Sequence, residues 1–211
     1  MALTTLDPNT ALIVVDLQKG LVGAPFIHPI GKVVERSRAL LHAFRERGLP
    51  VVLVNVAGGA PGRTERPRRS EPFPAGWTDL IAELDPQPGD IVVTKRTWGA
   101  FVNTGLEDRL KALGVTQVVV TGVATGTGVA TGTGVATGTG VATGTGVATG
   151  TGVESTARQA YEHGFNVTLA VDAMTDGRPE AHEYSIKHVF PKLGETGTAR
   201  DIIDLLGTRR A

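Results

Sequence analysis

Short runs of consecutive apolar, mostly β-branched residues alternate along the chain with longer stretches in which apolar residues have helical spacing. A continuous apolar run is typical of a strand that is buried on both faces, as in a parallel sheet. The predicted strands are 11–15, 51–56, 91–94, 118–121 and 167–171, and the predicted helices are 33–47, 78–84, 105–113, 154–163, 181–190 and 198–206. Because strand and helix alternate, the sequence predicts an α/β fold with a parallel sheet and helices on both faces.

Glycines follow three of the predicted helices, at Gly48, Gly114 and Gly164. A glycine in the left-handed conformation is a common way to end a helix, because it has no Cβ to clash with the backbone. We therefore expect these three glycines to have positive φ angles.

The length of 211 residues and the hydrophobic share of 41% predict one domain over 1–211, with a repeat insertion within 122–151. Lys plus Arg and Asp plus Glu are equal at 21 each, so no net charge attracts nucleic acid or an anionic membrane, and a small-molecule substrate is favoured. The absence of cysteine excludes disulfides, thiolate metal sites and a cysteine nucleophile. The first long apolar run, 11–15, is too short for a signal sequence or a membrane span, so we predict a cytoplasmic protein.

Five copies of the hexapeptide Gly-Val-Ala-Thr-Gly-Thr fill 122–151, between a predicted strand and a predicted helix. Each copy offers too little apolar surface to fold alone, so we favour an irregular or partly β excursion over a binding module or a packed β-structure that reshapes the site. Lengthening a connection fivefold costs about 1.4 kcal/mol, which is small beside a typical domain stability of about 5–15 kcal/mol. The fold should therefore tolerate the repeat.

The segment 58–74 is rich in proline and arginine and has no periodicity, which predicts a loop. One interpretation is a solvated connector. The other is a lid that supplies a guanidinium group to a substrate carboxylate, from among Arg63, Arg66, Arg68 and Arg69.

Asp16, Lys95 and Gly152 coincide with strand ends or with the end of the repeat, where ligands collect in open α/β sheets. Taken alone, an aspartate after a strand also serves as a helix cap, and a lysine there is commonly a surface charge. The surrounding sequence segments are what make these three residues candidates for a functional site.

The segments Val14-Val-Asp-Leu-Gln18, Lys95-Arg-Thr-Trp-Gly-Ala-Phe101, Val119-Val-Thr-Gly-Val-Ala-Thr125 and Gly152-Val-Glu-Ser-Thr-Ala-Arg158 together resemble the signature segments of the isochorismatase-like hydrolase superfamily. The resemblance runs from about Thr10 to Ala173 once four repeat copies are set aside. It implies a Rossmann-like three-layer α/β/α fold with a site made of an aspartate, a lysine and usually a cysteine. Gly152 stands at the cysteine position.

Isochorismatases proper carry glycine at that position, so the resemblance implies hydrolysis of an enolpyruvyl (vinyl) ether such as isochorismate to pyruvate and a dihydrodiol. Asp16 would then be the general acid, and Lys95 would hold a substrate oxygen and tune Asp16. Gln18 would position water or substrate, and Trp98 and Phe101 would form a wall, although core packing explains both aromatics equally well. The alternative is a catalytically inactive member with a binding or oligomerisation role, its site altered by the repeat.

The family also has a non-proline cis peptide, for which the repeat offers the candidates Val123–Ala124 and Val147–Ala148. Gly128 and Gly152 compete in the same way for the vacant cysteine position. Nicotinamidases of the superfamily bind a metal after the second strand, where this chain has Asn55-Val-Ala-Gly58, so we predict neither a metal nor a cofactor. Related proteins imply a homodimer or a larger homo-oligomer.

Overall fold

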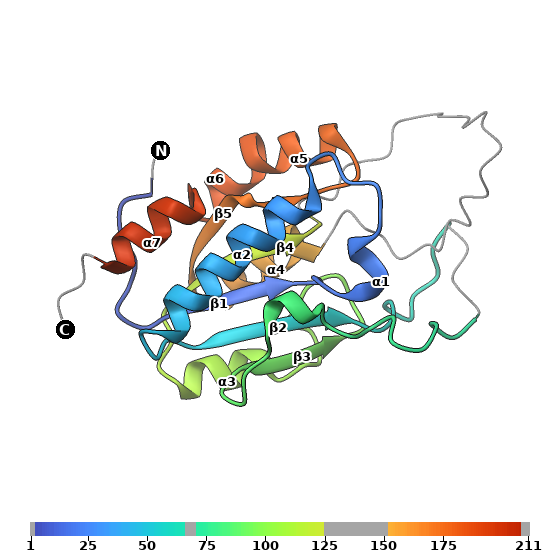
Figure 1. Cartoon of the computed structure of the whole chain (residues 1–211), viewed down its shortest axis with the longest axis horizontal. Coiled ribbons are helices and arrows are strands. Elements are labelled where there is room, and N and C mark those ends of the chain that lie inside the picture. Colours follow the sequence, from blue (N-terminus) through green and yellow to red (C-terminus); the bar gives the residue numbers. More distant parts are fainter. Residues whose placement is uncertain (1–2, 66–70, 125–151, 208–211) are drawn as a thin grey trace.

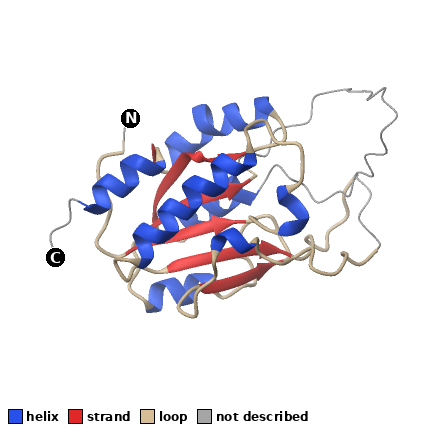
Figure 2. Ribbon diagram, viewed as in Figure 1, coloured by secondary structure: helices blue, strands red, loops and turns tan. Residues whose placement is uncertain are grey.

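Six strands, all parallel, form one sheet in the computed structural model, which describes residues 3–65, 71–124 and 152–207 (Figures 1 and 2). Their order across the sheet is β3-β2-β1-β4-β5-β6. The strands are β1 (Thr10–Val15), β2 (Val51–Val56), β3 (Ile91–Lys95), β4 (Gln117–Val123), β5 (Asn166–Thr175) and β6 (Glu195–Gly197).

The strand order reverses between β1 and β4, since the chain builds outward from β1 to β3 on one side and from β4 to β6 on the other. The two central strands pair in register from Thr10 beside Gln117 to Val15 beside Gly122. Loops leave such a switch point in opposite directions and open a crevice beyond the carboxyl ends of the strands. This edge of the sheet is therefore where a ligand site is expected.

Helices cover both faces of the sheet and give the predicted three layers. Leu12, Leu40 and Phe44 belong to the core between the sheet and the helices α2 and α7, and Ile13, Leu110 and Ala157 belong to the core on the opposite face, under α3 and α4. Figure 1 shows α2 in front of the sheet and α4 behind it. The helices are α1 (Lys19–Val22), α2 (Ile30–Arg45), α3 (Leu106–Ala112), α4 (Gly152–Glu162), α5 (Pro179–Tyr184), α6 (Phe190–Leu193) and α7 (Ala199–Gly207).

All five predicted strands are present, and the predicted left-handed glycines are confirmed. The φ angles of Gly48, Gly114 and Gly164 are 63°, 68° and 84°. Four predicted helices correspond to α2, α3, α4 and α7 with ends shifted by up to a few residues. The predictions rested on buried apolar runs and on backbone requirements at helix ends, both of which are local in sequence.

The predicted helix 78–84 is wrong, apart from a 3₁₀ turn at Ala82–Leu84. Leu80 instead forms an antiparallel bridge with Gln18, and the Ile81 N–H donates to the carbonyl of Leu17. These bonds to a distant segment replace the bonds that a helix would make. The predicted helix 181–190 is also modified, because a π-helical turn, Ser185–Val189, links α5 to α6.

The two ends of the repeat are held close together. Ala124 is the last described residue before residues 125–151, and the N–H of Val153 in α4 donates to the carbonyl of Ala124 at 3.0 Å. The predicted irregular or partly β conformation of the repeat falls on residues 125–151, which lie outside the described ranges. Within the described ranges, no helix has the length and apolar character needed to cross a membrane.

Phe44 of α2 is fully buried against the sheet. Phe44→Ala should therefore lower the free energy of unfolding by about 3–5 kcal/mol, through lost apolar burial and a residual cavity. Urea denaturation monitored by circular dichroism measures the change. Leu113→Ala is the matched control: Leu113 is 55% exposed, and its truncation should change stability by less than about 1 kcal/mol. Equal losses in the two variants would contradict the assigned core.

Candidate active site

Asp16 follows β1 directly and turns the chain away from the sheet. Its N–H still continues the strand pairing by donating to the Val54 carbonyl at 2.8 Å, while its φ of 57° is left-handed. Aspartate tolerates this conformation better than most residues with a Cβ. The turn leaves the carboxylate at the switch point, and Asp16 is only 5% exposed.

Lys95 ends β3 and reaches Asp16 from the side of β2 opposite to β1. Its ammonium nitrogen, Nζ, lies 2.7 Å from Oδ2 of Asp16, 2.9 Å from the carbonyl oxygen of Trp98 and 3.4 Å from that of Thr97. The residue is 2% exposed. A buried ammonium needs partners for its three N–H donors, and one carboxylate with two carbonyl groups supplies them.

Gly152 begins α4 against the same carboxylate. A Cβ at this position would lie 2.9 Å from Oδ2 of Asp16 and 2.8 Å from the carbonyl oxygen of Val123, closer than real Cβ contacts allow. Glycine therefore lets the amino end of the helix, with its partial positive charge, approach Asp16. The structure thus brings Asp16, Lys95 and Gly152 together, while the competing Gly128 lies outside the described residues.

The peptide bond between Val123 and Ala124 is cis. It ends β4 and precedes the carbonyl that accepts from Val153. The other candidate, Val147–Ala148, lies outside the described residues.

Burial raises the pKa of Asp16 from 3.8 to about 6, because removing the carboxylate from water costs more than the nearby Lys95 charge and hydrogen bond give back. The two carboxyl oxygens differ: Oδ2 accepts from Lys95, whereas Oδ1 is buried and has no hydrogen-bond partner among the described residues. A proton on this group therefore belongs on Oδ1. The site can present a neutral acid near pH 6.

Gln18 differs from the sequence-based expectation of a water- or substrate-positioning residue. Its Nε2 donates to the carbonyls of Val56 and Trp77, and its Oε1 accepts from the Val56 N–H at 2.7 Å. Buried backbone groups at the end of β2 need such partners. The amide of Gln18 thus joins β2 to the segment around Trp77.

The two predicted wall aromatics have different surroundings. Trp98 is 55% exposed, whereas Phe101 is buried in the core, with its ring near His163 and Phe165. Phe101 therefore packs in the core, which was the alternative role given for both aromatics. Among the loop arginines, Arg63 is exposed, and Arg66, Arg68 and Arg69 lie outside the described residues.

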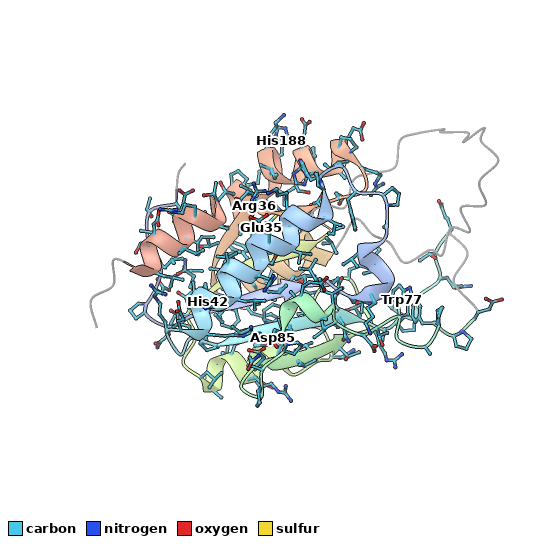
Figure 3. The ribbon with its side chains drawn as sticks, in the orientation of Figure 1. Glu35, Arg36, His42, Trp77, Asp85 and His188 are labelled. Carbon is cyan, nitrogen blue, oxygen red and sulfur yellow. The ribbon has the colours of Figure 1, made fainter. Side chains whose placement is uncertain are left out.

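An aromatic pair beside α1 was not predicted from the sequence. The rings of Phe73 and Trp77 stack with centroids 4.0 Å apart, and the Trp77 ring lies where a Cβ of Gly20 would be. Figure 3 shows Trp77 next to α1, at the end of the sheet toward which the strands run. The only sequence signal was a pair of large aromatics, Phe73 inside the predicted loop 58–74 and Trp77 between that loop and the predicted helix 78–84.

The prediction that the chain binds no metal was based on the residues at the end of β2. There, Asn55 uses its Nδ2 to donate to the Thr78 carbonyl at 2.7 Å. In the described parts of the chain, no three or more His, Cys, Asp or Glu side chains are grouped so as to hold a metal ion. The absence of a metal stays a prediction for the chain as a whole.

The three-layer parallel α/β fold, with a buried aspartate–lysine pair at the carboxyl edge of the sheet, places the protein in the Rossmann-like class. Within that class, the chain belongs to the isochorismatase family, because the isochorismatase domain model matches residues 10–143 and 136–201. The two matched segments overlap inside the repeat, where successive copies are identical in sequence.

Individual relatives agree with this assignment. The isochorismatase family protein YwoC of Bacillus subtilis is 32% identical over 93% of each chain. An isochorismatase family structure from Burkholderia thailandensis has a TM-score of 0.80 and 34% identity, covering 98% of this chain and 100% of that one. The ureidoacrylate amidohydrolase RutB of Variovorax paradoxus is 33% identical over 56% of this chain and 58% of its own length.

We expect Lys95→Met to raise the pKa of Asp16 further above 6, because it removes both influences that lower it and leaves the burial that raises it. The measurement is a carboxyl ¹³C NMR titration of protein labelled at aspartate, with the Asp16 signal assigned by its loss in Asp16→Asn. A matched control is Lys19→Met, which removes an exposed lysine paired with Asp79. A pKa for Asp16 that falls in Lys95→Met would contradict the described electrostatics.

Proposed function

We propose that this isochorismatase-family hydrolase cleaves an enolpyruvyl (vinyl) ether such as isochorismate, giving pyruvate and a dihydrodiol, with Asp16 as the general acid. The observation that supports this most is the buried Oδ1 of Asp16, which has no hydrogen-bond partner among the described residues and belongs to a group whose pKa is about 6. Hydrolysis of a vinyl ether needs one well-placed proton donor and no nucleophilic side chain. The chain has no cysteine to serve as such a nucleophile.

In the proposed reaction, Oδ1 gives its proton to the terminal methylene carbon of the substrate, and the C=C electron pair forms the new C–H bond. Water then attacks the resulting oxocarbenium carbon and passes a proton back to the Asp16 carboxylate. The hemiketal then collapses: its C–O bond to the ether oxygen breaks, the hydroxyl group becomes the ketone of pyruvate, and the hydroxyl proton passes to the ether oxygen, which leaves as the alcohol. Lys95 remains an ammonium 2.7 Å from Oδ2 and stabilises the carboxylate while it is ionised.

Gly152 supports the same chemistry. A side chain at this position would clash with Oδ2 of Asp16, whereas glycine lets the amino end of α4 lie directly against the carboxyl group. Substrate-binding roles for Trp98 and for the Phe73–Trp77 pair are part of the proposal, since these aromatics lie on segments joined to Lys95 and Gln18.

Amide hydrolysis is a second candidate because the relative RutB is named as an amidohydrolase. Without a thiol, this chain would have to use water as the nucleophile and an ionised Asp16 as the base. The two candidates therefore need opposite protonation states of one residue. A third possibility is an inactive member whose site is altered by the repeat.

Asp16→Asn should reduce pyruvate release from isochorismate by about 10²–10⁴-fold, because an amide cannot supply the proton. A lactate dehydrogenase-coupled assay measures the product, and circular dichroism checks the fold. Asp204→Asn, at an exposed residue of α7, is the matched control and should retain full activity. No release by intact wild-type protein would reject the proposal.

The pH dependence separates the acid from the base mechanism. With Asp16 as the acid, kcat/KM should be high below pH 6 and fall about tenfold per unit above it, since the protonated form is lost as pH rises through its pKa of about 6. A rate that rises through the same range would instead identify Asp16 as a base and favour amide hydrolysis, which can be assayed with ureidoacrylate.

Deleting four of the five hexapeptide copies tests whether the repeat matters for the site. Val123–Ala124 and Gly152 keep their neighbours in the shortened chain, so we expect unchanged kcat/KM. Activity that appears only after the deletion would support the inactive alternative, in which the repeat blocks the site. Light scattering on both forms tests the proposed homo-oligomer and a role of the repeat in it, and identical states would reject that role.

A further inference from the structure

The position of the Lys95 ammonium depends on the backbone segment that follows it. Two of its three acceptors are the carbonyl groups of Thr97 and Trp98, at 3.4 and 2.9 Å. We call residues 97–101 the lysine cradle. A shift of the lysine cradle would move these carbonyls, and with them the ammonium that faces Asp16.

The lysine cradle is itself held against α4 by side chains of that helix. The N–H of Phe101 donates to Oε1 of Gln159 at 3.0 Å, and the N–H of Ala100 donates to Oγ1 of Thr156 at 3.2 Å. A Cβ on Gly99 would lie 2.3 Å from Oε1 of Gln159, so only glycine at this position permits so close an approach.

The same helix therefore contacts both sides of the ion pair. Its first residue, Gly152, lies against Oδ2 of Asp16, and Gln159, about two turns along, fixes the segment that holds Lys95. Thr156 joins the two contacts, because its hydroxyl also donates to the Gly152 carbonyl at 2.7 Å.

We propose that Gln159 is a positioning residue: it fixes the lysine cradle on α4 and so keeps the Lys95 ammonium on Asp16, which sets the acidity of the proposed catalytic acid. This inference rests on the proposed function of Asp16 but concerns a residue that acts through the backbone of the lysine cradle. Loss of the Gln159 acceptor leaves the part-buried Phe101 N–H without this partner and loosens the lysine cradle, although the bond from the Ala100 N–H to Thr156 remains. The ammonium then moves off Oδ2, and the attraction that lowers the pKa of Asp16 weakens.

The test is a ¹³C NMR titration of the Asp16 carboxyl group in full-length variants without substrate. Gln159→Met keeps the length of the side chain but removes its acceptor, and it should raise the pKa of Asp16 by about half a unit or more. Glu162→Gln, at an exposed position of the same helix, is the control and should leave the pKa within about 0.2 units of wild type. An unchanged pKa in folded Gln159→Met would overturn the proposal.

Gly99→Ala perturbs the same contact from the opposite side by pushing Oε1 of Gln159 away, and it keeps the proposal testable if Gln159→Met does not fold. If both changes act through one contact, the double variant should shift the pKa no further than the larger single shift, whereas additive shifts would overturn the assignment to this contact. Because no substrate is used, wild-type protein that releases no pyruvate would reject the proposed function without affecting this titration. An active enzyme with an unshifted Gln159→Met would reject the positioning role alone.

Discussion

The buried ion pair between Asp16 and Lys95 is the interaction on which the arrangement of the site depends. It joins the end of central strand β1 to the end of edge strand β3, across the intervening β2, at 2.7 Å. Removing two charges from water is costly, and such a pair persists only where further hydrogen bonds satisfy it. Here the carbonyls of Thr97 and Trp98 satisfy the ammonium, but Oδ1 of the carboxylate has no such partner among the described residues. The ammonium is thus held on three sides, whereas the oxygen that the proposed mechanism uses has no hydrogen bond from the described residues.

Much of the fold was predictable because its signals are local. Continuous apolar runs identified the strands that pack on both faces, and glycines after α2, α3 and α4 identified positions with positive φ. The conformation of residues 78–81, which leave a turn and form a bridge at Leu80, could not be predicted in this way, because it follows from bonds to Asn55, Leu17 and Gln18. Those partners are more than twenty residues away in the chain, and no sequence pattern within the segment indicates these contacts.

The site was predictable to a similar degree. A parallel sheet gathers the carboxyl ends of its strands at one edge, so Asp16 and Lys95 were expected together once they were placed at strand ends. The direction of the Gln18 amide and the burial of Phe101 depend on tertiary contacts and could not be read from spacing. Identical repeat copies also carry no local information about which of them is used. Only contacts distinguish them: Val123–Ala124 continues β4, and Gly152 lies against Asp16.

The hydrogen bond from Val153 to Ala124 has a consequence for how this gene can change. It ties together the residues on either side of positions 125–151, so the chain returns to the place that it left. Gain or loss of whole hexapeptides by replication slippage keeps the reading frame and reproduces the same flanking residues at both junctions. Copy number can therefore vary among descendants of this sequence while the residues in contact with Asp16 stay the same. The repeat therefore marks a position at which the chain can gain or lose whole copies without changing the residues at the two junctions.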